Sequence, residues 1–197
     1  MNYGAKGSEM VAGRNLGARS PEMSGIAKPE AGRSTAKRNF ILQQGFEDPA
    51  PAVCSIQYSA LVFQTKVVLV WIVAGMLFQS PAVFAVLGGL LWWSALFPKL
   101  NPFRALYNYT LGSRAGAFHL APSPAPRRAA ETEAGTIALT SALVSNSGLT
   151  LAAYAVEIFF LAAALAVLIG SFCFGTFNYH ILRGNSRFAL RTLPWAR

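Results

Sequence analysis

The charged residues of this chain avoid four long apolar stretches, and this pattern constrains the fold more than any other feature. The stretches cover about residues 59–78, 81–97, 134–148 and 150–177. Sixteen of the seventeen Lys and Arg residues lie outside them, the exception being Lys66. An apolar helix of about 20 residues crosses a hydrocarbon core of about 30 Å. The sequence therefore predicts an all-α membrane protein with four transmembrane helices.

The segments between these stretches are alternately basic and uncharged. The chain before residue 59, the linker 98–133 and the chain from residue 183 onward carry the basic residues. The two short connections, residues 79–80 and 145–149, carry no charge. Lys and Arg close to membrane helices stay on the cytoplasmic side during insertion. We therefore expect two helical hairpins in a bacterial inner or intracytoplasmic membrane, with both termini in the cytoplasm.

Composition supports a membrane location and limits the number of domains. Charged residues make up 13% of the 197-residue chain, against about 25% in ordinary soluble domains. The mean hydropathy is +0.38. The net charge of +9 follows the topology, which favours contact with anionic lipids over binding to nucleic acid. We expect one transmembrane domain over residues 51–183, between cytoplasmic tails over residues 1–50 and 184–197.

The N-terminal tail lacks any sustained hydrophobic period. Residues 1–50 mix Gly, Ala, Ser and Pro with scattered charges. Such a segment buries too little apolar surface to offset the entropy of ordering it. The tail is therefore expected to be disordered, or to be ordered by a partner subunit.

Two sets of residues are candidates for contacts with other subunits. The linker begins with an aromatic and basic stretch and ends with paired arginines, and four of its residues are predicted to lie at a cytoplasmic docking surface: Arg104, Tyr107, Arg127 and Arg128. Small residues at four-residue spacing in the fourth stretch would let another helix approach closely: Ala162, Ala166 and Gly170. Both sets indicate a protein that works within an assembly.

Aromatic side chains mark the cytoplasmic end of the second stretch. Trp92 and Trp93 lie close to its last residue. Indole rings favour the boundary between hydrocarbon and headgroups, where they anchor a helix. The same rings are candidates for contact with lipid or with a pigment of a host complex.

Glu157 is the carboxylate within the apolar stretches, about two helical turns inside the fourth one. An ionised group at this depth is costly unless it is paired, protonated or hydrated, which makes it a candidate functional residue. Lys66 is expected near the cytoplasmic side, where its long stem reaches the interface. We expect Glu157 to contact Ser or Thr of the third stretch or another subunit, rather than Lys66. A role in a small transporter is the alternative.

His180 is a candidate ligand for haem iron or for the magnesium of a chlorophyll, because it follows the last apolar stretch. The only other histidine, His119, lies in the linker and cannot complete a bis-histidine site within the bundle. A single histidine is a weak signal for such a ligand, and a histidine that faces the headgroups is the favoured interpretation. The chain contains no clustered metal ligands, no phosphate-binding loop and no nucleophile-base pair in its sequence. No cofactor of its own is therefore expected, and bacteriochlorophyll, carotenoid or lipid would belong to a host complex.

Short motifs in the linker and after the fourth stretch resemble one known family. They are Asn101-Pro102-Phe103, Pro124-Ala125-Pro126-Arg127-Arg128-Ala129-Ala130, Gly135 and Ser171-Phe172-Cys173-Phe174-Gly175-Thr176-Phe177-Asn178-Tyr179. The chain is similar, over about residues 46–183, to the small bacterial membrane proteins grouped as domain of unknown function 4395. The resemblance implies a four-helix membrane module, and the Cys-x-x-Cys motif of that family implies thiol redox chemistry in some members. Here Thr176 stands in the place of the second cysteine.

These patterns together favour a non-catalytic accessory subunit of a larger, energy-transducing membrane complex, photosynthetic or respiratory. The protein is not expected to be an enzyme. A membrane thiol-redox protein that acts through Cys173, alone or with Cys54, is the alternative. A small transporter that uses Glu157 is a second alternative.

Overall fold

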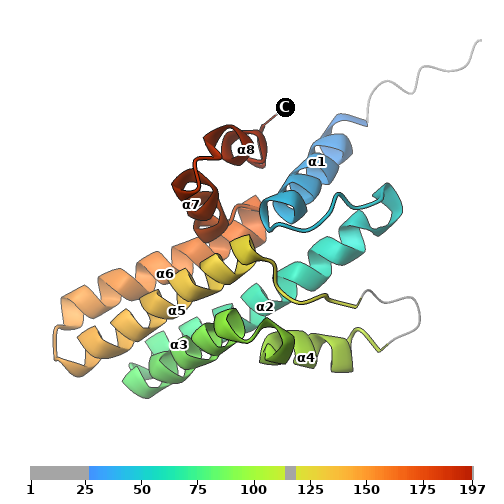
Figure 1. Cartoon of the computed structure of the whole chain (residues 1–197). Coiled ribbons are helices and arrows are strands. Elements are labelled where there is room, and N and C mark those ends of the chain that lie inside the picture. Colours follow the sequence, from blue (N-terminus) through green and yellow to red (C-terminus); the bar gives the residue numbers. More distant parts are fainter. Residues whose placement is uncertain (1–26, 114–118, 197) are drawn as a thin grey trace, which may run out of the picture.

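The computed structural model describes residues 27–113 and 119–196, and this part of the chain is helical and contains no strand (Figure 1). The elements are α1 (Ala27–Gln43), α2 (Pro51–Phe78), α3 (Pro81–Leu96), the 3₁₀ turn η1 (Pro98–Leu100), α4 (Pro102–Thr110), α5 (Ala125–Asn146), α6 (Thr150–Gly170), α7 (Phe174–Leu182) and α8 (Ser186–Arg191). The predicted all-α fold class is confirmed.

Four long helices form the body of the molecule as two hairpins, α2 with α3 and α5 with α6 (Figure 1). Helix α5 packs against α3, α6 and α7, and α2 packs against α6. The first hairpin turns at Gln79, whose φ of 44° is left-handed, and Pro81 begins the next helix where a missing amide donor costs nothing. The predicted hairpin arrangement of the helices is therefore present.

Two helices in the described part of the chain, α2 and α6, are long and apolar enough to cross a membrane. Helix α3 is apolar but has 16 residues, and α5 begins with polar turns. Only 33% of the most apolar window of α2 and 22% of that of α6 are buried inside the chain. A helix in the core of a water-soluble protein would be covered over most of its surface. Most residues of these two windows are instead half-buried or exposed.

Two helices begin earlier than the predicted spans. Helix α2 begins at Pro51 rather than near residue 59, and α5 begins at Ala125 rather than near residue 134. In both cases a proline lies in the first turn, where its fixed φ favours a helix start. The last nine residues of the predicted linker 98–133 are therefore helical. Hydropathy shows where a chain is apolar enough for a membrane interior, but it does not show where a helix begins or ends.

The predicted continuous span 150–177 is wrong. Helix α6 ends at Gly170, and Ser171 follows with a left-handed φ of 52°. The amide of Ser171 donates to the Val167 carbonyl at 3.1 Å, which closes the helix end. The chain then starts again as α7, so one apolar run contains two helices.

The N-terminal tail departs from the prediction of disorder or ordering by a partner. Residues 1–26 lie outside the described part, but residues 27–43 form α1, which packs against α2. Phe40 and Ile41 are fully buried there. The Asn39 amide donates to the Leu193 carbonyl at 3.1 Å. The chain itself therefore orders this helix, because the apolar end of α1 covers the start of α2.

Helices α3 and α5 approach each other closely at Gly88 and Gly135. A Cβ atom on Gly88 would lie 3.0 Å from the Gly135 carbonyl oxygen and 2.7 Å from Leu139 Cγ. A Cβ atom on Gly135 would lie 2.7 Å from Trp92 Cδ1. Small residues permit this close contact between helices in a membrane, where packing and not water exclusion drives association.

We predict opposite outcomes for two neighbouring glycines of α3. Gly88→Ala should destabilise the bundle by about 1–3 kcal/mol, because the added methyl group meets the backbone of α5. Gly89→Ala is the matched control, since a Cβ atom there has nothing within 4 Å, and it should be neutral or stabilising by up to about 1 kcal/mol. Thermal unfolding of both variants in one mild detergent measures the difference. Equal melting temperatures would show that α3 and α5 do not pack as described.

Candidate functional site

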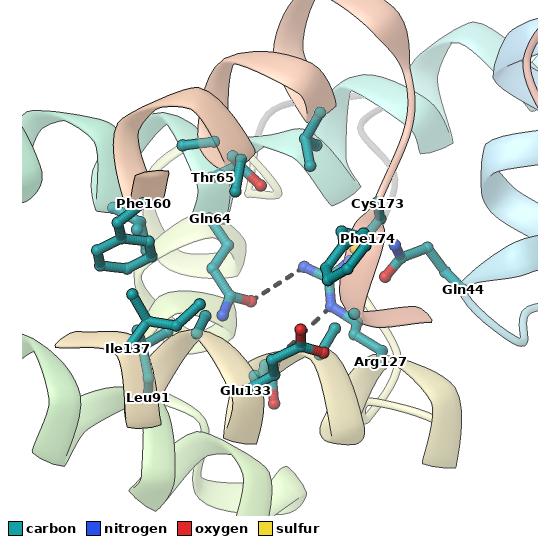
Figure 2. A pocket seen from close by; sticks show the side chains of 18 of the residues that line it. Gln44, Gln64, Thr65, Leu91, Arg127, Glu133, Ile137, Phe160, Cys173 and Phe174 are labelled. Carbon is teal, nitrogen blue, oxygen red and sulfur yellow. Dashed lines mark hydrogen bonds and ion pairs between the residues drawn. The ribbon is translucent and has the colours of Figure 1, made fainter. Parts of the chain in front are cut away.

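A cavity of about 120 Å³ lies within the bundle, between α2, α5 and α6 and next to the start of α7 (Figure 2). Most of its wall is apolar, and one end is polar. The apolar wall includes Val68, Leu91, Ile137, Phe160 and Ala164, and the polar end includes Gln44, Gln64, Arg127, Glu131, Glu133 and Cys173. An apolar cavity with a few convergent polar groups is the usual form of a small-molecule site.

Arg127 occupies the polar end of the cavity and is buried, with 8% of its surface exposed. Its Nη2 donates to the Leu61 carbonyl at 3.0 Å and to Gln64 Oε1 at 3.0 Å. Its Nε lies 3.6 Å from Glu131 Oε1, one helical turn along α5. Figure 2 shows the contacts with Gln64 and with the carboxylate as dashed lines. One guanidinium group thus joins α5 to α2.

Glu131 is the second buried member of this polar end, with 4% exposure. Its Oε1 accepts from Asn101 Nδ2 at 3.2 Å and from Ser123 Oγ at 3.2 Å. Its Oε2 has no hydrogen-bond partner in the described part of the chain. The residue precedes the expected membrane stretch, and burial raises the pKa of its carboxyl group although the charge of Arg127 opposes this.

Glu133 connects the cavity to α7. Its Oε1 accepts from Asn178 Nδ2 at 3.2 Å, and burial raises the pKa of the carboxyl group. Gly175 lies against α5 at this point, since a Cβ atom there would be 2.7 Å from Ala130 Cα. A side chain at residue 175 would therefore push α7 away from the cavity wall.

Cys173 lines the cavity from the residue before α7 and is partly buried. Thr176, three residues further along, is fully buried, and its hydroxyl donates to the Cys173 carbonyl at 3.0 Å. Cys54 is buried in an apolar cluster against which Cys173 also packs. Both thiols are free. The two cysteines thus share one end of the bundle.

Glu157 is fully buried at the other end of the bundle. Its Oε1 accepts from Ser145 Oγ at 3.3 Å, so the predicted contact with a hydroxyl of the third stretch is confirmed. Its Oε2 accepts from Gln79 Nε2 at 3.4 Å. Lys66 is exposed, and the described residues contain no ion pair between it and Glu157. The carboxylate therefore links the two hairpin turns.

His180 does not face the headgroups, the arrangement that its position favoured, but is buried with 7% exposure. Its Nε2 donates to the Gln43 carbonyl at 3.0 Å, and its ring packs edge-on against Phe188, with centroids 4.7 Å apart. The ring thus connects α7 to the end of α1. A histidine with Nε2 used in this way does not present that atom to haem or chlorophyll. His119 is exposed.

The predicted cytoplasmic docking surface is smaller than expected. Arg127 is used inside the bundle, and Tyr107 is buried with its ring against Phe63. Arg128 is partly buried and donates from Nε to the Ala95 carbonyl at 2.6 Å. The guanidinium of Arg104 donates to the Lys99 carbonyl. The prediction is therefore wrong for Arg127 and Tyr107. Arg127 lies at the polar start of α5 and Tyr107 in the aromatic part of the linker, and other parts of the same chain cover both side chains.

The predicted small-residue ridge of α6 faces away from the bundle. Ala162 and Gly170 are exposed and Ala166 is partly exposed. The stripe of α6 that packs inward is Ala153, Glu157, Phe160, Ala164 and Val167. No other helix in the described part of the chain covers this ridge. Trp92 and Trp93 are also exposed, at the end of α3.

The family relationship can now be stated. A family model described as a domain of unknown function, DUF4395, matches residues 57–183. The chain belongs to this family. The predicted resemblance is confirmed, with a matched range that starts after the expected residue 46. No curated protein and no solved structure matches the chain.

The DUF4395 region contains all of the cavity wall except Phe40 of α1 and Gln44, which directly follows α1. Phe40 and Gln44 close the cavity from outside the matched range. Sequence reasoning did not single out Gln64, Asn101 or Glu131, which the fold brings to Arg127. The available signal was the Arg127–Glu131 spacing, because an opposite charge four residues away lies on the same helix face. The described residues contain no group of three or more His, Cys, Asp or Glu that could hold a metal ion.

We predict strong coupling between Arg127 and Glu131. Arg127→Met should destabilise the bundle by about 3–5 kcal/mol, because it leaves the buried carboxylate without its countercharge. Arg127→Met with Glu131→Met should recover most of this loss, since no buried charge remains. Thermal unfolding of the single and double variants in detergent measures the coupling. Additive losses would contradict a buried ion pair at this position.

Proposed function

We propose that this DUF4395 protein crosses a bacterial inner membrane four times, with both termini in the cytoplasm. The outward apolar surfaces of α2 and α6 support a membrane location. The two uncharged hairpin turns lie at one end, together with Glu157, and the basic linker lies at the other. In this arrangement α3 and the later part of α5 cross the membrane beside α2 and α6, and the Arg127 layer lies at the cytoplasmic boundary.

We further propose that the protein is a non-catalytic accessory subunit of a larger, energy-transducing membrane complex, photosynthetic or respiratory. The observation that carries this proposal is the outward ridge of Ala162, Ala166 and Gly170 on α6, which the bundle leaves uncovered. Such a ridge accepts a helix of another subunit at short distance. Trp92 and Trp93 offer exposed rings to lipid or pigment of the host at the same membrane boundary.

The polar side chains of the bundle support a structural role. The buried ionisable side chains best suited to chemistry are held by contacts within the chain. They are Arg127, Glu131 and Glu157. Glu157 in particular accepts hydrogen bonds from Gln79 in the first turn and from Ser145 near the end of α5, which supports a structural role over transport.

Native co-migration tests the accessory role. The tagged protein, extracted from its own membranes in mild detergent, should migrate with larger subunits on a native gel. Ala162→Phe should abolish co-migration, because the ring blocks the ridge, while the chain stays in the membrane. Leu165→Phe, at an exposed position of α6 about 60° around the helix from Ala162 and on the side away from Ala166 and Gly170, is the control and should leave co-migration intact. Migration of the unmodified protein as a free monomer would contradict the proposal.

Thiol chemistry at Cys173 is a second candidate function, favoured by one observation. The thiol lines the cavity and is only partly buried, whereas Cys54 is buried in an apolar cluster. We predict that N-ethylmaleimide labels Cys173 in the Cys54→Ser variant faster than it labels Cys54 in the Cys173→Ser variant near neutral pH. Mass spectrometry of timed samples gives both rates. A Cys173 that labels no faster than Cys54 would rule out this function.

A further inference from the structure

The segment after α6 is fixed to the body of the molecule. Helix α7 lies against α5, where a Cβ atom on Gly175 would be 2.7 Å from Ala130 Cα. Ala189 of α8 is fully buried, and the ring of Trp195 packs against that of Phe172 with centroids 5.9 Å apart. Figure 1 shows α7 and α8 at the end of the bundle opposite the two hairpin turns. The segment therefore has a defined place at this end.

The outer side of this segment carries positive charge without acidic neighbours in the chain. Residues 158–197 contain no Asp or Glu. Arg183, Arg187 and Arg191 are exposed, and none of the three is in an ion pair within the described part of the chain. The guanidinium of Arg183 lies over the ring of Tyr179, 5.5 Å from its centroid. This concentration of unpaired cations attracts an anionic partner.

Helix geometry places two of these arginines on the side of α8 that faces away from the bundle. Successive residues of a helix are about 100° apart, so Arg187 and Arg191 both lie about 160° from the buried Ala189. Phe188 and Leu190 lie on either side of them and are 39% and 55% exposed. The outward face of α8 thus carries two cations between two apolar side chains.

The most exposed apolar side chains of the segment are close in the chain to these cations. Leu182 is 87% exposed next to Arg183, and Trp195 is 69% exposed four residues after Arg191. Such side chains lose the free energy of burial in water, whereas Arg, Leu, Phe and Trp together are typical of a surface that binds at the headgroup boundary. An acidic water-soluble partner would pair with the arginines but would leave the apolar side chains unexplained. The combination favours a lipid surface.

We propose that the outer side of the segment after α6 binds anionic phospholipid headgroups at the cytoplasmic boundary of the membrane. The arginines pair with the negatively charged headgroups, and the apolar side chains lie at the level of the first acyl carbons. This C-terminal surface consists of Leu182, Arg183, Arg187, Phe188, Leu190, Arg191 and Trp195. The proposal rests on the membrane location and the cytoplasmic C-terminus proposed above, and it does not depend on a partner subunit.

The lipid preference can be measured on the purified full-length chain in a neutral detergent. Mixed micelles offer equal amounts of phosphatidylglycerol and phosphatidylcholine with the same acyl chains, and mass spectrometry counts the lipids that remain with the protein after gel filtration. Phosphatidylglycerol should be enriched at least about fivefold, the contribution of one arginine near an anionic surface. Excess inorganic phosphate should not displace it, because free phosphate has no acyl chains. Equal retention of the two lipids, or displacement by phosphate, would overturn the proposal.

Paired variants locate the lipid contact. Arg187→Gln with Arg191→Gln should abolish the enrichment of phosphatidylglycerol, because the outward face of α8 loses both cations. Lys66→Gln with Lys99→Gln removes the same charge from two exposed side chains outside the C-terminal surface and should leave the enrichment unchanged. Melting temperatures confirm that both double variants are folded. An equal loss in the two double variants would show a general effect of net charge and would contradict the proposal.

The depth of Trp195 distinguishes a lipid surface from an acidic protein partner. In vesicles that contain phosphatidylglycerol, lipids with brominated acyl chains should quench the part of the fluorescence that the Trp195→Phe variant lacks. Iodide in the water phase should quench this part little, because an indole at the boundary is shielded. Quenching by iodide and not by the brominated chains would place the C-terminal surface in water, and the proposal would then be wrong.

The membrane location on which the proposal rests has a separate test. Reconstituted in vesicles of pure phosphatidylcholine, the protein should resist extraction by alkaline carbonate, although these vesicles contain no anionic lipid. Extraction would contradict the membrane location itself. Resistance together with equal retention of the two lipids would contradict only the role of the C-terminal surface.

Discussion

Burial of the Arg127 guanidinium is the constraint on which the arrangement of the helices depends. A cation removed from water must find both a countercharge and acceptors, and losing one partner of such a pair costs several kcal/mol. The acceptors come from α2, at the Leu61 carbonyl and Gln64, and the countercharge comes from Glu131. Glu131 in turn accepts from Asn101, whose own Oδ1 caps α4 through the Arg104 amide at 3.0 Å. One cation thus fixes α2, α5 and the start of the linker relative to one another.

Polar contacts at both ends of the bundle define how the apolar helices align. Apolar side chains in a membrane gain little from choosing one neighbour over another, so registration requires directional contacts or close packing. Glu157 provides directional contacts at the hairpin turns through Gln79 and Ser145. Between the two polar ends, Gly88 on α3 lies against the backbone of α5. The bundle is thus fixed at each end by hydrogen bonds. Near its middle it is fixed by the close packing of α3 against α5 that a glycine permits.

The sequence allowed accurate inference where one local signal was sufficient. Pro81 after an uncharged turn predicted the first hairpin, and the cost of a buried carboxylate predicted a hydroxyl partner for Glu157. It did not predict the break at Ser171, because the apolar composition continues through the break into α7. The surroundings of His180 were also out of reach, since its partner Gln43 lies 137 residues away in the sequence. Long-range contacts of this kind depend on the fold as a whole and leave no local pattern.

The cavity itself follows from the fixed ends of the bundle. Its wall on α5 and α6 includes several small side chains, among them Ala134, Ala163 and Ala164. Helices with such faces normally move together until the space is filled, because an unfilled space forfeits dispersion contacts. Here Glu157 holds α6 against the turn of α2 and the end of α5, and Arg127 holds α5 against α2 at the other end. The helices between these two polar contacts cannot close on each other without breaking one of them, so the space between the alanines persists as a cavity.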